Sequence, residues 1–190
     1  MFAKTGRCGL VLAASALMAV GACATKAPPT SDIVVSVPIG DVPGVDWENP
    51  IHGVQVPSFE AARKELAFDP ALPQGLGTPS RILVSDPGTP KEGRVIAFLY
   101  DTDSFGLIVI TEAPIEADPE VYDAFNASVP SNAPPGTAEM KTIRGGSPAL
   151  LFLGKNGAPA GVYWRQELVE FHVWGPSATS DQILGIAAKV

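Results

Sequence analysis

Three acidic residues near the middle of the chain have a spacing that could hold a metal ion: two lie between a pair of apolar runs, and one follows the second run. The segment Asp101–Glu112 reads DTDSFGLIVITE, with acids at its positions 1, 3 and 12 and a glycine at position 6. This is the spacing of a helix–loop–helix calcium site. Position 5 of such a loop supplies an oxygen, but Phe105 stands there, and both flanks are typical of strands. The segment therefore predicts a β-hairpin turn and no calcium site.

A serine and a histidine raise the question of a hydrolase. Ser147 follows a glycine pair, and His172 lies two residues after Glu170. A nucleophilic serine needs a base within hydrogen-bond reach, and many hydrolases hold it in a G-x-S-x-G turn. Pro148 directly follows Ser147, which favours a simple turn between strands. We expect no catalytic residue, and a hydrolase that uses Ser147 and His172 stays as the least favoured alternative.

Metal and cofactor sites have little support in the residues. The chain has two histidines, His52 and His172, and neither has a cysteine near it in sequence. No glycine-rich phosphate-binding motif precedes an expected helix. We therefore expect no metal and no cofactor. The candidates for ligand binding are Trp164, His172 and Trp174 on the last expected hairpin, and packing in the core is the alternative interpretation.

The N-terminus has the pattern of a secretory signal. Lys4 and Arg7 precede an apolar run, Gly9–Gly21, that is too short to cross a bilayer comfortably. Small residues end the run, and Cys23 follows. Val20-Gly21-Ala22-Cys23 resembles the lipobox of bacterial lipoproteins. The resemblance implies that residues 1–22 are removed and that Cys23 carries the lipid. Ordinary signal cleavage after Ala24 is the alternative, and it would release a free protein.

A proline-rich stretch follows the expected lipid site. The segment 23–50 has prolines at 28, 29, 38, 43 and 50, which disfavour helix and sheet. In a polyproline-like form its last 25 or so residues would reach ~75 Å. It is expected to act as a tether, although Ile33–Val37 has the pattern of an edge strand and Trp47 is able to dock on the domain.

The remaining residues, 51–190, predict one α+β domain. Helices are expected at Phe59–Ala67 after a cap at Ser58, and after a cap at Ser177 or Ser180. Another is expected at Glu120–Ala127, with Val121, Phe125 and Tyr122 inward. Strands are expected in series, joined by short turns, which favours an antiparallel sheet of six to seven strands with helices on one face. The expected strands are Arg81–Val84, Arg94–Tyr100, Leu107–Thr111, Ala138–Ile143, Ala149–Leu153, Ala158–Trp164 and Leu168–Trp174.

Several of these segments together suggest a family. Phe68, Pro73, Leu76-Gly77 and Pro79 follow the first helix, GLIVITE lies at Gly106–Glu112, and Gly146-Ser147-Pro148-Ala149 and Tyr163-Trp164 come later. In this order they resemble a bacterial domain of unknown function found on anti-sigma-factor-like membrane proteins and in envelope lipoproteins. The resemblance covers about Val54–Val190 and implies no catalytic residues.

The net charge and the expected lipid anchor together limit the classes of function that fit this chain. The net charge of −7 disfavours nucleic acid as a partner. We expect an envelope lipoprotein held by its lipid on the outer side of the cytoplasmic membrane, or on the outer membrane where there is one. Its domain is expected to be a non-catalytic binding or sensing module whose partner is an envelope protein, a lipid or a wall component. A carrier with an apolar cavity for a lipid is the main alternative.

Overall fold

The computed structural model describes residues 46–47, 49–85, 88, 90–154 and 159–190. The lipobox, Cys23 and residues 1–45 of the signal and tether lie outside the described residues. Within the described part the elements are, in chain order, β1 (Val54–Gln55), α1 (Phe59–Glu65), β2 (Arg81–Val84), a 3-10 turn (Lys91–Gly93), β3 (Ile96–Thr102), β4 (Gly106–Pro114), α2 (Pro119–Asn132), β5 (Ala138–Thr142), a second 3-10 turn (Arg144–Gly146), β6 (Pro148–Leu153), β7 (Ala160–Gln166), β8 (Val169–Gly175) and α3 (Ser180–Ala187).

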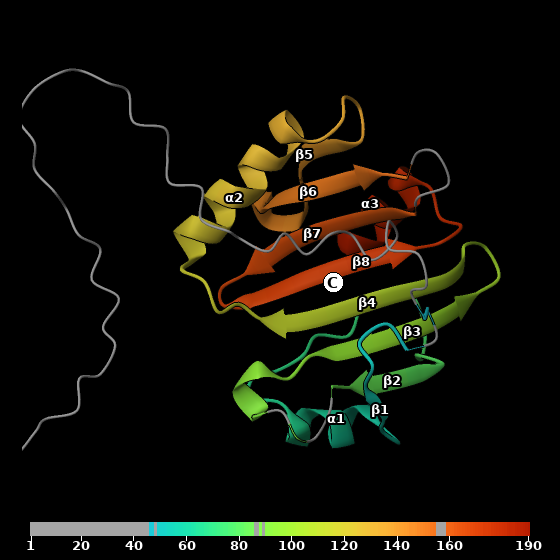
Figure 1. Cartoon of the computed structure of the whole chain (residues 1–190). Coiled ribbons are helices and arrows are strands. Elements are labelled where there is room, and N and C mark those ends of the chain that lie inside the picture. Colours follow the sequence, from blue (N-terminus) through green and yellow to red (C-terminus); the bar gives the residue numbers. More distant parts are fainter. Residues whose placement is uncertain (1–45, 48, 86–87, 89, 155–158) are drawn as a thin grey trace, which may run out of the picture. The chain divides into compact units, whose positions relative to one another are not determined.

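The strands form one antiparallel sheet. Among the described residues it has eight strands in the order β1-β2-β3-β4-β8-β7-β6-β5. Two four-stranded meanders therefore meet at the β4–β8 pair in the centre, where Ile110 lies opposite Val173 (Figure 1). The α+β prediction is confirmed, but the predicted six to seven strands were too few. The missed strand is β1, whose two residues are too short a run to show alternation.

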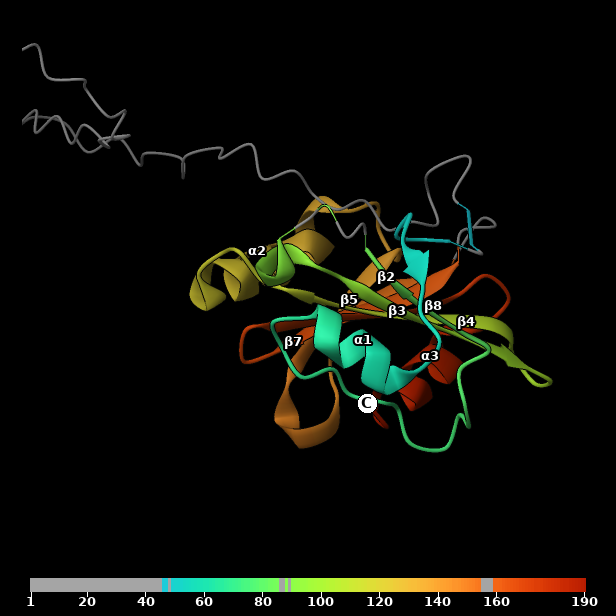
Figure 2. The same ribbon diagram turned by 90° about the horizontal axis from the view of Figure 1, so that it is seen from below.

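Helices cover both faces of the sheet, although one face was predicted. Figure 2 shows α1 and α3 on one side and α2 on the other. On the α1/α3 face, alternate strand residues such as Phe98, Ile110 and Val162 pack with Ala62 and Ile183 of the two helices. The α2 face has a smaller set of buried residues, including Leu99, Val109 and Tyr163. The side-chain period of two along each strand separates these two sets.

Local signals explain where the helices begin. The Ser58 hydroxyl accepts a hydrogen bond from the Ala61 N–H at 3.1 Å, which confirms the predicted cap of α1. For α3 the cap is Thr179, not Ser177 or Ser180. The Thr179 hydroxyl accepts a hydrogen bond from the Gln182 N–H, and the Gln182 side chain accepts one from the Thr179 N–H. None of the helices in the described residues has the length and apolarity needed to cross a bilayer.

Helix α2 differs most from its prediction. It begins at Pro119 and continues through Pro130 to Asn132, beyond the predicted end at Ala127. Val121, predicted to face inward, is 52% exposed. The other two residues predicted to face inward, Tyr122 and Phe125, are half-buried, and so is Asp123. The helix thus lies on the sheet by a face that includes polar groups.

Candidate functional site

Two of the three predicted ligand residues lie together, and the third does not. His172 and Trp174 are on the α2 face, where their ring centroids are 5.9 Å apart. Tyr163 joins them from β7, with its ring centroid 4.1 Å from that of His172. Trp164 points to the α1/α3 face, where it stacks on Phe171 at 5.2 Å. The prediction that groups Trp164 with the other two was wrong, because adjacent strand residues face opposite sides of a sheet.

A chain of polar contacts joins this aromatic cluster to α2. The His172 Nε2 atom is 2.6 Å from Glu170 Oε1, and the Tyr122 hydroxyl donates to the same oxygen at 2.8 Å. Burial by itself would raise the pKa of Glu170. The hydrogen bond and charge of His172, together with the hydrogen bond from Tyr122, outweigh burial, so the pKa of Glu170 lies below its ordinary value. Burial is also the main cause of the raised pKa of Tyr122. The carboxylate therefore stays charged and holds both partners.

An ion pair fastens α2 to the sheet next to this chain. Arg165 Nε donates to Asp123 Oδ1 at 2.7 Å, and Arg165 Nη2 donates to Asp123 Oδ2 at 2.6 Å. Two parallel bonds between a guanidinium and a carboxylate give both strength and a fixed orientation. Arg165 lies directly opposite Glu170 in the β7–β8 pair, so the two contacts to α2 are neighbours. No local pattern in the sequence indicates this pair, because 42 residues separate its members.

The predicted tether contributes one aromatic residue to the same face. Trp47 meets Trp174 edge to face, with ring centroids 5.8 Å apart. The loop that carries it is built locally, since the Asn49 side chain accepts from the Gly53 N–H and donates to the Gly53 carbonyl. A side chain at Gly53 would meet the Val84 carbonyl at 2.5 Å, so the close approach requires glycine.

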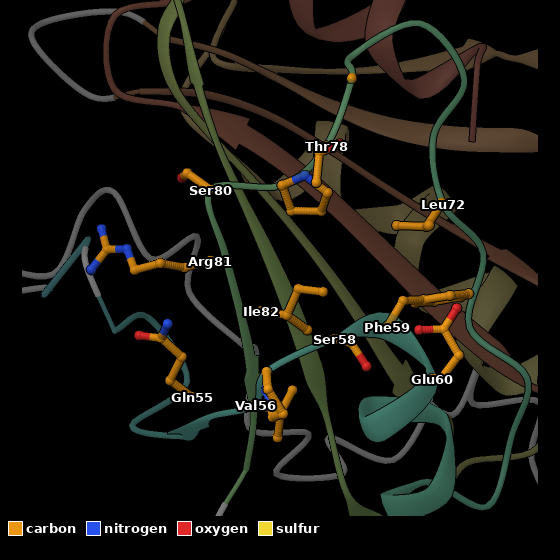
Figure 3. A pocket seen from close by; sticks show the side chains of 13 residues that line it. Gln55, Val56, Ser58, Phe59, Glu60, Leu72, Thr78, Ser80, Arg81 and Ile82 are labelled. Atoms are coloured by element: carbon orange, nitrogen blue, oxygen red, sulfur yellow. The ribbon is translucent and has the colours of Figure 1, made fainter.

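A groove of about 420 Å³ opens beside the β1 edge of the sheet. In Figure 3, Val56, Phe59 and Ile82 face it, while Gln55 and Arg81 point to the other side of β2. Leu72 and Thr78 line its far wall from the segment between α1 and β2. Two of its polar side chains are engaged in local structure, since Ser58 caps α1 and the Ser80 hydroxyl donates to the Leu99 carbonyl. The groove therefore offers shape without an assembled set of reactive groups.

The catalytic and calcium alternatives do not assemble in the described residues. Ser147 precedes β6, which is two strands away from β8. The register aligns Ala149 with Trp164 and Phe171, so Ser147, two residues before Ala149, lies beyond the level of His172. Asp101 lies at the β3–β4 turn, whereas Glu112 is at the far end of β4, opposite Ile96. The expected hairpin is confirmed. In the described part of the chain there is no group of three or more metal-ligating side chains.

Glu112 has a role that the sequence did not suggest. It is fully buried on the α1/α3 face, where its two oxygens accept from the Ala71 N–H at 3.0 and 3.2 Å. Burial raises its pKa to about 8, despite the opposing Ala71 bond, and Asp69 adds to the rise. The nearby Tyr100 hydroxyl, also buried, has no hydrogen-bond partner among the described atoms. Both groups lie within the core.

Comparisons with known proteins gave no family: no family model matches the chain, and no curated protein matches it.

Proposed function

We propose that the chain is a bacterial envelope lipoprotein whose domain is a non-catalytic binding or sensing module. Residues 1–22 are its signal, Cys23 bears the lipid, and residues 23–50 are the tether. The lipobox-like Val20–Cys23 supports the anchor, and the resemblance to the domain of unknown function supports an envelope setting. The membrane is then its first partner, and a second envelope component binds the domain.

The α2 face is proposed to be the binding surface. The observation that carries this is the set of contacts around His172, which pairs with Glu170 and packs between Tyr163 and Trp174. A carboxylate and two rings hold this imidazole, and Ser147, the nucleophile of the hydrolase alternative, lies beyond its level, so a role in recognition is proposed. A hydrolase therefore remains the weakest candidate.

A lipid carrier is the second candidate. It needs apolar space between sheet and helices, and on the α1/α3 face that space is filled: Phe98, Ile110 and Ile183 have no exposed surface. The α2 face differs, because its helix is held mainly by polar contacts at one end. The carrier site of this second candidate is therefore proposed under α2.

Mass and membrane partition test the anchor. The protein and a Cys23→Ser variant are expressed in a bacterial host, and the intact mass and the membrane-bound fraction are measured. Diacylglycerol mass on the wild type together with pelleting, both lost in the variant, is the expected result. A soluble mature chain that begins after Ala24 contradicts the lipoprotein proposal.

A further inference from the structure

Helix α2 is attached to the sheet in an unusual way. None of its described residues is fully buried, whereas α1 buries Ala62 and α3 buries three residues. Pro130 lies inside the helix and lacks an N–H donor, so one helical hydrogen bond is missing. A helix with no buried anchor depends on the few contacts that fix it.

Those contacts have different chemistry at the two ends of α2. At the N-terminal end they are polar, namely Asp123 with Arg165 and Tyr122 with Glu170. At the C-terminal end Val129 and Ala133 rest on the apolar cluster of the α2 face. The polar pair is also open to water, since the Arg165 and Asp123 side chains are 25% and 38% exposed. A competing carboxylate can therefore reach Arg165.

We propose that α2 is an opening cover, and that the surface beneath it binds a fatty acid whose carboxylate replaces Asp123 on Arg165. This deepens the proposed function of the α2 face and rests on it. In the unliganded protein, the Asp123 carboxylate therefore occupies the position on Arg165 that the ligand's carboxylate takes. A guanidinium that already holds a carboxylate with two parallel bonds presents the geometry that a second carboxylate needs.

The surface beneath α2 fits one charged head on an apolar body. Away from Arg165 it consists of apolar side chains from β5, β6 and β7, namely Ala138, Leu150, Phe152 and Tyr163. The charges that face the head group lie at one end of this surface. Arg165 attracts a carboxylate, whereas Glu170 and Asp123 repel it. Glu170 is itself in contact with His172 and Tyr122. Repulsion from Glu170 is thus offset by its own partners.

An acyl chain fits this surface better than a peptide. The strand backbone groups of β6 and β7 are used in the ladder on both sides and lie in the plane of the sheet. Among the described strands, edge strand β5 pairs with β6 alone, and its remaining groups lie in the same plane, not on the face beneath α2. A peptide lying on the face would leave its own N–H and C=O groups without partners there. An acyl chain has no such groups.

Decanoate binding to the full-length chain with Cys23→Ser tests the proposal by calorimetry. Asp123→Asn removes the internal competitor, so we expect it to bind decanoate about fivefold more tightly than its parent. Arg165→Gln is expected to lose binding, and Arg165→Lys, which keeps the charge without the fork, to retain part of it. Glu139→Gln, which breaks the ion pair with Lys141 on edge strand β5, is the matched control and should bind like its parent.

Two results would overturn the proposal. One is an Asp123→Asn variant that binds no more tightly than its parent, or an Arg165→Gln variant, folded by circular dichroism, that binds equally well. The other is a short apolar peptide with a free carboxylate that binds more tightly than decanoate and depends on Arg165 in the same way, which would make the ligand a peptide. Neither result bears on the Cys23 anchor, which mass and partition measure separately.

Discussion

The two faces of the sheet are stabilised by different chemistry. The α1/α3 face is an apolar core in which strand residues such as Phe98 and Val162 have no exposed surface. On the α2 face, half-buried groups of α2 meet groups of β7 and β8 through hydrogen bonds and an ion pair. Apolar burial is strong and non-directional, whereas polar contacts exchange with water at little net gain. One face therefore holds the fold together, and the other is suited to exchange partners.

Two phenylalanines give the largest contrast between the faces. Phe98→Ala, on the α1/α3 face, should lower the free energy of unfolding by ~3–5 kcal/mol, because its side chain is fully buried. Phe152→Ala, on the half-buried α2 face, should cost less than ~2 kcal/mol. Urea denaturation measures both. Equal losses would mean that the faces contribute alike to the fold.

Glu112 gives the core face a pH dependence. Its folded pKa of about 8 lies above the ordinary value, so the folded state keeps a proton that the unfolded state releases. Stability contributed by this group should fall as the pH rises from about 4.5 to about 8, by on the order of 5 kcal/mol. Glu112→Gln should remove this fall. Chemical denaturation across that range tests it, and an unchanged slope in the variant would contradict the role given to Glu112.

Two glycines sharpen the account of packing around α3. A Cβ at Gly175 would lie 2.8 Å from the Ala178 Cβ and from the Ile108 side chain, so Gly175→Ala should cost ~1–3 kcal/mol. Gly185 is inside α3 with open space around it, and Gly185→Ala should add ~0.5–1 kcal/mol through helix propensity. Opposite signs in thermal melts are expected. A neutral Gly175→Ala would show that the core yields there.

Tyr122 gives the smallest effect, and a local one. Tyr122→Phe removes the hydrogen bond to Glu170 and should cost ~0.5–1.5 kcal/mol. The loss should appear as faster amide exchange in α2 with little change in the exchange of α3. Uniformly faster exchange would place Tyr122 in the cooperative core instead.

The strands were predictable because local patterns specify them. The β3–β4 and β7–β8 hairpins show apolar runs or alternation around polar turns, and Thr102 and Gly106 close the first one as the sequence indicated. Two-residue β1 carries too little pattern to find. The continuation of α2 through Pro130 was missed because contacts with the sheet override a local stop signal.

The candidate site was predictable only in part. His172 and Trp174 lie on one strand face, which alternation alone indicates. Trp164 follows Tyr163 directly, so its side chain lies on the α1/α3 face, opposite the other two candidates. Asp123 and Arg165 meet through the chain's return over the sheet, and no local spacing encodes that meeting. Pairings of this kind depend on the topology of the fold, which local sequence patterns do not reveal.

Amide hydrogen exchange of the full-length chain, read separately over Pro119–Asn132 and Ser180–Ala187, tests the difference between the faces most directly. The account predicts that α2 exchanges through local opening, well before α3, and that Asp123→Asn speeds α2 alone. If α2 and α3 exchange together at the rate of global unfolding, α2 is part of the core. The α2 face would then not open.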